Sequence, residues 1–527
     1  IEAALAAHIA AKKHCTEAEA QRGLENRDPR VAEILDGITV LDPAVGSGAF
    51  LLGMLDRLSA LRRDNSSVAR KRRVLQQSLF GVDRNAAAVR LTELRLWLAV
   101  ISDDRSDNPA SVRPLPNLDC LIRQGDSLFE PTGLAPGLHS QDQQLVARLS
   151  RARQQVFTAS GPDKPALARQ LRQMERQALE CSFEAAEQHH RRIISDYLRQ
   201  AREPDLFGHR RGLDRALRTC LTQERLTLRR LRHEHRRVVR EGEIPWFHYQ
   251  SAFADVFARG GFDVVIGNPP WLRSEAIPGA TRMQLSARYR WWRRQGRTYG
   301  NSPDLAVAFL ERAFELAAPN AIVAMLVPVK VATAGYGPAA RHALASACTL
   351  HVLADLTGRE EAVFEATVYP LAVVASKSTP ADDQRVRTAL STASRHHIPQ
   401  STLRGGGPWV LTARGGLPEV LADLERLYPV LSEALTCHLG VKTGLNRVFL
   451  NPPADIEQHL LRWAVRGQDV RAFVCRPKVR LLWTHDERGA PIAQLPIKAR
   501  AYLAQHDSAL RARRDYGGGP PWCLFRA

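Results

Sequence analysis

The sequence lacks paired cysteines. Its eight cysteines are dispersed over 527 residues, and no two of them have the C-x-x-C spacing that is typical of zinc ribbons and redox motifs. The pattern excludes the disulfide framework of a small secreted protein and gives no indication of a metal site. We therefore expect free thiols in the reducing cytoplasm of a bacterium and no bound metal.

The sequence also lacks any apolar run long enough to span a bilayer. No charged-then-apolar leader precedes the first domain, and the chain begins at Ile1 and not at Met. An apolar content of 44% with a mean hydropathy of −0.27 is typical of a globular protein. We expect no membrane association, two to four domains, and a sequence that is a piece of a longer protein.

Acidic residues are too few to balance the basic ones. The chain has 74 Lys and Arg against 55 Asp and Glu, a formal net charge of +19 and a pI of about 10.1. A GC-rich genome explains part of the arginine content but not the imbalance of sign. The excess predicts a polyanionic partner, because clustered cations attract and hold phosphates.

One stretch, FDVVIGNPPW at 262–271, predicts a buried strand that runs directly into a stiff loop. Three β-branched residues in succession favour a strand. Pro269 and Pro270 fix two φ angles, so the loop presents the amide of Asn268 and the ring of Trp271. These groups suit a planar ring with an amino group. A loop that only turns the chain is the alternative.

Three earlier strand ends carry acidic residues. The segment 38–41 is followed by DPAVGSGAF at 42–50, a glycine-rich turn before a helix, which brings backbone N–H groups close to a ligand. Asp83 ends the next strand and is placed to accept from ribose hydroxyls, although capping the following helix is the alternative. Asp126 follows a third short strand.

Helical spacing replaces the strand–helix alternation from about 140 to 241. The last of these helices carries a run of arginines between 229 and 240, either a phosphate-contacting arm or a solvated helix face. The neighbouring histidines at 189/190 and 396/397 are predicted to lie at the surface. After the NPPW loop, aromatic and basic residues alternate, as in loops that grip nucleic acid. This segment gives the predicted DNA contacts Arg290, Trp291, Trp292, Arg293, Arg294 and Arg297.

The motifs DPAVGSGAF, GVDRN, GDSL and NPPW, in this order, resemble those of the gamma-class N6-adenine DNA methyltransferases, and most closely the branch of type IIG restriction–modification enzymes and BREX-like phage-defence methylases. The likeness covers about 30–376. The family's upstream tyrosine-threonine-proline segment is absent here. A weaker likeness at 440–446, which includes Lys442, suggests the start of a target-recognition region.

The resemblance implies an α/β, Rossmann-like S-adenosylmethionine-dependent methyltransferase sheet with a long helical insertion and a partial C-terminal target-recognition domain. It implies five segments: 1–139 with the cofactor motifs, 140–241 as the Arg-rich insertion, 242–380 with the catalytic motif, 381–407 as a linker, and 408–527 as the DNA-binding domain.

The resemblance also implies the residue roles. S-adenosylmethionine binds at Asp42, Pro43, Gly46, Gly48 and Phe50, with Asp83 on the ribose and Asp126 on the adenine. The catalytic loop is Asn268, Pro269, Pro270 and Trp271, and the flipped adenine stacks on Trp271 and Phe364. The partners are double-stranded DNA and restriction or defence subunits at the nucleoid. Two alternatives stay open: an amine methyltransferase for RNA or protein, and an inactive DNA-binding subunit.

Overall fold

The computed structural model describes residues 1–62, 66–104, 114–131, 133–134, 143–203, 212–241, 246–293, 303–356, 369–389, 396–405, 407–409, 411, 424, 427–429, 431–436, 438, 440–513 and 516–525. The chain divides into two compact units, Ile1–Glu419 and Val420–Ala527. Each unit has a hydrophobic core of its own.

The first unit is built on a mixed sheet with the strand order β3-β2-β1-β4-β5-β7-β6-β8-β9. Neighbouring strands from β3 to β5 are parallel, whereas β7 is antiparallel to both β5 and β6. The predicted Rossmann-like α/β fold is confirmed. The strands are β1 Val40–Asp42, β2 Leu79–Asp83, β3 Ile122–Gln124, β4 Phe262–Gly267, β5 Ala317–Pro328, β6 Thr349–Asp355, β7 Pro370–Ser376, β8 Arg385–Arg387 and β9 His397–Pro399.

The order of the strands reverses between β1 and β4, which lie side by side at the centre of the sheet. Val264, Val265 and Ile266 of β4 are fully buried, as expected for a parallel strand with both faces covered. In open parallel sheets, ligands bind beyond the carboxyl ends of the strands at such a reversal. The ends of β1 and β4 are Asp42 and Gly267, so the predicted loops meet at this point.

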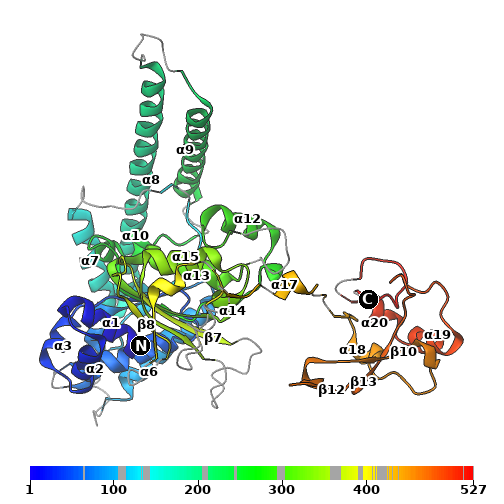
Figure 1. The fold of residues 1–527 in the computed structure, drawn as a ribbon. Helices are drawn as coiled ribbons and strands as arrows, with labels where there is room; N and C mark the ends of the chain where they lie inside the picture. Colours follow the sequence, from blue (N-terminus) through cyan, green and yellow to red (C-terminus); the bar gives the residue numbers. More distant parts are fainter. Residues whose placement is uncertain are drawn as a thin grey trace. The chain divides into compact units, whose positions relative to one another are not determined.

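Helices cover the faces of the sheet (Figure 1). The buried positions of α13 run almost uninterrupted from Ala306 to Phe314. The described helices of the first unit outside the stretch 140–241 are α1 Glu2–Lys13, α2 Glu17–Glu25, α3 Pro29–Ile34, α4 Ala49–Leu61, α5 Ser67–Ser78, α6 Ala86–Ile101, α10 Tyr249–Ala252, α11 Ala254–Phe257, α12 Gly279–Arg288, α13 Leu305–Leu316, α14 Lys330–Thr333 and α15 Pro338–Ala347.

Three helices occupy the stretch in which helical spacing was predicted: α7 Gln143–Thr158, α8 Lys164–Arg202 and α9 Arg215–Glu241. The 39 residues of α8 correspond to a length of about 58 Å. Figure 1 shows α8 and α9 side by side as a hairpin that projects from the body of the sheet. Phe183 of α8 and Leu231 of α9 are fully buried in a small apolar cluster of their own.

The structure differs from the prediction at the stretch 381–407 and at His190. The stretch 381–407, predicted as a linker, carries β8 and β9, which extend the sheet because Val386 and Ile398 are buried in its core. These short strands were not predicted from the sequence because polar residues or a proline flank the buried apolar residue at their centres. His190 is not at the surface: it is buried, one ring nitrogen lies 2.6 Å from Glu224, and the other lies 3.1 Å from the carbonyl of Gly133.

The second unit consists of short elements around a small core. Its strands pair as two antiparallel ribbons, β10 Leu461–Ala464 with β13 Val479–Leu482 and β11 Val470–Arg471 with β12 Val474–Cys475. Phe449 and Leu482 are fully buried in its core. The helices are α17 Leu431–Ala434, α18 Asn446–Phe449, α19 Ile497–Ala504 and α20 Asp507–Arg511.

Among the described helices, none combines the length and the apolarity that crossing a bilayer requires.

Candidate functional site

Asp42 is the last residue of β1, and its carboxylate lies between the loop after β1 and the end of β4. It is 1% exposed, and its Oδ1 accepts a hydrogen bond of 3.0 Å from the backbone N–H of Ala44. Burial, reinforced by the nearby charge of Asp83, raises the pKa of Asp42 to about 7. Oδ1 also lies 2.7 Å from the point where Gly267 would carry a Cβ. Only glycine at the end of β4 therefore lets this carboxylate lie against the start of the loop that follows β4.

The glycine-rich turn after β1 is held by side chains from β2 and α6. Gly46 and Gly48 have φ values of 54° and 76°, which favour glycine. Asp83 accepts 2.9 Å and 2.8 Å hydrogen bonds from the N–H groups of Gly46 and Asn85. Asn85, and not Asp83, caps α6 by accepting from Ala87, so the alternative role of Asp83 as that helix cap is wrong. The turn is thus held in place by the protein itself.

Close packing under Gly48 fixes the turn further. A Cβ on Gly48 would lie 2.8 Å from the methyl group of Thr92, whose hydroxyl donates to the carbonyl of Gly46 at 3.0 Å. Arg95 donates to the carbonyl of Ser47 at 2.7 Å. Pro43 is buried, and Phe50 is partly buried against the core. The predicted cofactor residues of this loop therefore lie together.

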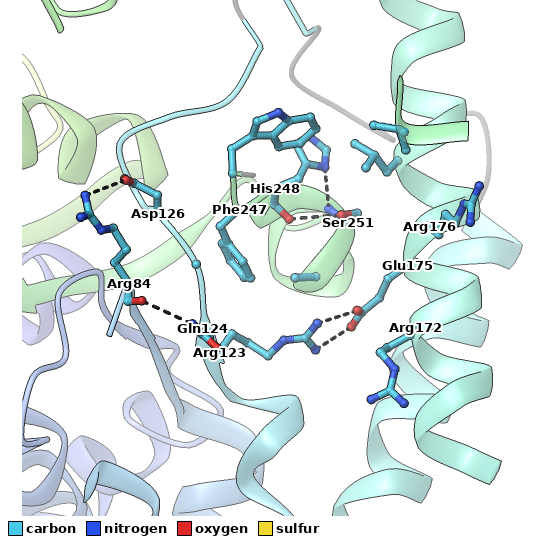
Figure 2. A pocket seen from close by; sticks show the side chains of 15 residues that line it. Arg84, Arg123, Gln124, Asp126, Arg172, Glu175, Arg176, Phe247, His248 and Ser251 are labelled. Atoms are coloured by element: carbon cyan, nitrogen blue, oxygen red, sulfur yellow. Dashed lines mark hydrogen bonds and ion pairs between the residues drawn. The ribbon is translucent and has the colours of Figure 1, made fainter. Parts of the chain in front are cut away.

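The end of β3 brings Asp126 to the same edge. Its Oδ1 accepts from the N–H of Leu128 at 3.1 Å, and its Oδ2 lies 3.8 Å from the guanidinium of Arg84. Figure 2 shows Asp126 and Arg84 on one side of a cavity of about 800 Å³, with Phe247 beside them. Phe247 packs so closely that a Cβ on Gly125 would meet it at 2.5 Å.

A buried network that was not predicted from the sequence ties the β3 end to the β1 end. Ser127 donates to the carbonyl of Pro43 at 2.6 Å and accepts from the hydroxyl of Tyr249 at 2.8 Å. Arg312 of α13 donates to the carbonyl of Ser127 at 3.0 Å and forms a two-pronged ion pair with Glu130. An arginine within the apolar helix 305–316 was the signal that could have revealed it.

This network keeps its charges paired. Burial opposes ionisation of Glu130, yet the guanidinium of Arg312 lowers the pKa of Glu130 to about 2. Burial also raises the pKa of the Tyr249 hydroxyl above its usual range. The segment that follows β3 is thus anchored by an ion pair that stays charged at neutral pH.

The loop after β4 presents an unpaired acceptor. The Oδ1 atom of Asn268 is buried and has no hydrogen-bond partner among the described residues, a costly state that native structures seldom retain without a role. Pro269 is buried and Pro270 is exposed. Trp271 is partly buried, and its Nε1 donates to the carbonyl of Leu326 on β5 at 3.3 Å, which fixes the ring.

The predicted DNA-gripping segment is partly core. Trp292 is 2% exposed and donates to the carbonyl of Asp304, so the expectation that its ring is available to bases is wrong. Trp291 is partly buried and packs against Phe314. Apolar faces turned inward and charged ends turned outward account for the alternation of aromatic and basic residues. Arg290 and Arg293 are exposed.

The remaining predicted residues lie elsewhere or outside the described chain. Lys442 belongs to the second unit, where it is exposed with its Nζ 5.9 Å from the centre of the Phe525 ring. Arg294, Arg297 and Phe364 are not among the described residues. Over the described ranges, no group of three or more His, Cys, Asp or Glu side chains is arranged to hold a metal ion.

The residues present fit a cationic adenosine cofactor such as S-adenosylmethionine. Asp42 supplies a buried carboxylate for a positive charge, and the turn at Gly46 and Gly48 lets a ligand approach the backbone. Asp83 and Asp126 offer carboxylate oxygens at the two adjacent strand ends. The unpaired oxygen of Asn268 remains for a second ligand that brings a donor.

Fold and site together define a Rossmann-like protein whose predicted site residues gather at the reversal point of its sheet, the place where open α/β sheets bind ligands. The chain belongs to the Eco57I restriction-modification methylase family, whose model matches residues 77–364, more than half of the chain.

Among curated proteins, it is 26% identical over 285 residues to the type II methyltransferase M.XhoI of Xanthomonas vasicola, covering 48% of this chain and 50% of that protein. It is 36% identical over 124 residues to a putative type II restriction enzyme and methyltransferase of Methanocaldococcus jannaschii, covering 20% and 10%. The type II methyltransferase M.BstVI of Geobacillus stearothermophilus is 23% identical over 291 residues, covering 48% and 49%. The chain spans about half the length of M.XhoI and M.BstVI.

Among solved structures, the type IIL restriction-modification enzyme MmeI in complex with DNA is similar with a TM-score of 0.42 and 12% identity, over 97% of this chain and 54% of that one. The M protein of the type I restriction enzyme EcoKI is similar with a TM-score of 0.30 and 15% identity, over 80% and 55%.

Proposed function

We propose that this chain methylates the N6 amino group of adenine in double-stranded DNA, using S-adenosylmethionine, as a gamma-class methyltransferase. The observation that carries the proposal is the buried Oδ1 of Asn268, which has no partner among the described residues and belongs to the residue after Gly267, against which the carboxylate of Asp42 packs. Membership of the Eco57I family and the likeness to type II methyltransferases support it.

The chemistry asks mainly for positioning. The amino nitrogen of adenine is a poor nucleophile because its lone pair is delocalised into the ring. The Oδ1 of Asn268 and the carbonyl of Pro269 accept its two hydrogens, which favours a pyramidal nitrogen with a localised lone pair. The cofactor, when bound, supplies a methyl group on a strongly electrophilic sulfonium. Holding the nitrogen in line with that methyl provides most of the acceleration, so neither acceptor needs to be a strong base.

The three acidic strand ends divide the cofactor between them. Asp42 faces the positively charged methionine end, Asp83 accepts from the ribose hydroxyls, and Asp126 accepts from the adenine amine. Asp83 already accepts two backbone hydrogen bonds, and a carboxylate has further lone pairs for hydroxyl donors. Pro43, Gly46, Gly48 and Phe50 form the wall of this pocket.

The target adenine must leave the duplex to reach Asn268. Unstacking a base costs a few kcal/mol, and stacking on Trp271 offsets part of that cost because the ring is already held by Leu326. Phe364 is proposed as the second stacking face, and Arg290, Arg293, Arg294, Arg297 and Lys442 as backbone contacts. A target-recognition role for 408–527 and a restriction or phage-defence partner complete the proposal.

The test is transfer of labelled methyl groups to pooled genomic DNA, to total RNA and to protein, followed by chromatography of the hydrolysed nucleosides. The proposal expects label in DNA as N6-methyladenine and none above background in the other two. A chain carrying Asn268→Ala supplies the background. Label on RNA or on a protein glutamine, with DNA unlabelled, would overturn the choice of substrate.

A further inference from the structure

We propose that one face of α9 is a binding surface for the DNA backbone, placed to hold the duplex that delivers adenine to Asn268. The inference rests on the proposed function and deepens it by naming a contact surface outside the catalytic loop. The α9 arginine face is the set of side chains spaced by seven, four, three, four and four residues, namely Arg218, Arg225, Arg229, Arg232, Arg236 and Arg240.

The spacing places all six side chains on one side of the helix. Steps that average 3.6 residues return to the same face after each turn. The apolar positions Leu221, Leu228, Leu231 and Val238 are buried on a different face. The arginine face therefore differs from the buried apolar face of α9, and Arg232 at its margin reaches Glu187 of α8.

These arginines are exposed, and most of them have no ionic partner among the described residues. All six are exposed, and Arg218, Arg225, Arg229 and Arg236 form no ion pair with a described residue. Arg232 pairs with Glu187 at 3.3 Å and Arg240 with Glu241 at 2.7 Å. The face therefore keeps a strong positive excess, which a row of phosphates complements.

The hairpin rises on the catalytic side of the sheet. The chain beyond the carboxyl end of β3 runs along α8: Arg123 pairs with Glu175 at 2.7 Å, and the carbonyl of Gly133 lies 3.1 Å from His190. Between Glu175 and His190, α8 thus runs outward beside the chain that follows β3 and carries Asp126. Glu224 of α9 holds the same His190 at 2.6 Å. The arginine face consequently extends beyond the edge at which Asn268 lies.

The length of the face matches a duplex. From Arg218 to Arg240 the helix rises about 33 Å, and one turn of B-DNA advances about 34 Å. A DNA duplex that brings its target base to this edge can therefore contact all six arginines. A solvated helix face, the alternative, does not require a row of this length at this place in the fold.

The experiment compares two triple variants of the full 527-residue chain. Arg225→Gln, Arg229→Gln and Arg236→Gln remove three charges from the arginine face while keeping good helix formers. The matched control removes three exposed charges from helices α1 to α3, as Lys12→Gln, Arg22→Gln and Arg30→Gln. Binding to a fluorescent 40-base-pair duplex is followed by anisotropy across a salt titration, together with cofactor binding and helical circular dichroism.

We expect the α9 variant to lower the slope of log affinity against log salt by about 2 to 3, and to lose on the order of a hundredfold in affinity at 0.1 M salt. The control should lose far less. An α9 variant with the wild-type slope and a native circular dichroism spectrum would overturn the inference even if the chain methylates DNA. A lowered slope in a chain that transfers no methyl group to DNA would support the surface and sink the proposed function.

Discussion

The loops after β1 and β4 meet at the same point of the sheet but differ in how their polar groups are satisfied. In the first loop, the backbone groups of Gly46 are taken by Asp83 and Thr92, and the carbonyl of Ser47 is taken by Arg95. In the second, the Oδ1 of Asn268 is buried without a partner among the described residues. The named polar groups of the first loop already have hydrogen-bond partners in the protein, whereas the second loop keeps an acceptor that a ligand could satisfy.

On the proposed function, this difference gives the β1 loop the task of binding cofactor and the β4 loop that of methyl transfer. A loop whose hydrogen bonds are internally satisfied is rigid before a ligand arrives, so it lowers the ordering cost of binding. An acceptor left open in a buried place lowers the stability of the protein, and it is useful only when a donor arrives. Changes in the β1 loop should therefore alter cofactor affinity, whereas changes in the β4 loop should alter the methyl-transfer rate.

Replacing Asn268 with Ala should give the largest effect. Loss of a positioned acceptor should lower kcat by about a hundredfold to a thousandfold or more, by analogy with the loss of an oxyanion donor. The dissociation constant of the cofactor should stay within about threefold of wild type, because the β1 loop is untouched. Single-turnover transfer of labelled methyl groups and a cofactor titration measure the two quantities.

A stability measurement separates this role from a structural one. The Oδ1 of Asn268 has no described partner, so its removal should leave the melting temperature unchanged or slightly higher. Asn26→Ala, at the exposed end of α2, is the matched control and should keep full activity. A clear fall in melting temperature for Asn268→Ala would mean that the amide holds the loop together, and the proposed separation of the two loops would fail.

Replacing Asp83 with Ala should act on affinity. The change removes the acceptor of two backbone N–H groups, those of Gly46 and Asn85, and the proposed partner of the ribose. Hydrogen bonds to a charged group are each worth about 1.5 to 3 kcal/mol, so cofactor affinity should fall by about tenfold to a hundredfold. At saturating cofactor, kcat should recover. A variant that binds normally but transfers slowly would reverse the assignment of the two loops.

Asp42 allows the comparison to be tested by pH. Burial raises its pKa to about 7, so the folded protein holds a proton on Asp42 that the unfolded chain has released above about pH 4. The free energy of unfolding should therefore decrease as pH rises from about 4 to 7. A cationic ligand favours the ionised carboxylate, so cofactor affinity should rise from pH 6 to pH 8, by up to about tenfold per unit below the pKa.

Asp42→Asn should remove this pH dependence and bind cofactor weakly at every pH. Calorimetric titration in two buffers with different ionisation enthalpies counts the protons released on binding. Wild type should release up to one proton near pH 6 and almost none at pH 8. Equal proton release by the variant and the wild type would show that another group titrates.

The arrangement of the site was largely predictable from the sequence because parallel strands bring their carboxyl ends to one edge. A strand run followed by Asp42, Asp83, Asp126 or Asn268 is a local signal, and the topology needs only the order of these units. The side-by-side position of Asp42 and Gly267 was not predictable in this way. It depends on the pairing of β1 with β4, two strands more than two hundred residues apart.

Burial of amphipathic side chains was the main source of error. Trp292 and His190 occur in stretches rich in charge, yet the ring of each is enclosed and its polar atom finds a partner. Tryptophan and histidine have apolar bodies and polar ends, so composition alone does not decide between core and surface. Arg312 is a charged residue whose burial was not predicted. Its guanidinium is neutralised by Glu130, which lies far away in the sequence, and by Glu315 of the same helix.

The smallest effect should come from Trp271→Phe. Phenylalanine keeps an aromatic face for the flipped adenine but loses the 3.3 Å hydrogen bond to the carbonyl of Leu326. A neutral hydrogen bond is worth about 0.5 to 1.5 kcal/mol, so kcat/KM for DNA should fall by about twofold to tenfold while cofactor affinity is unchanged. Trp271→Ala, which removes the stacking face as well, should fall further, by about 1 to 3 kcal/mol of base stacking. Equal losses in the two variants would show that orientation by Leu326, and not the aromatic surface, is what the β4 loop requires of this residue.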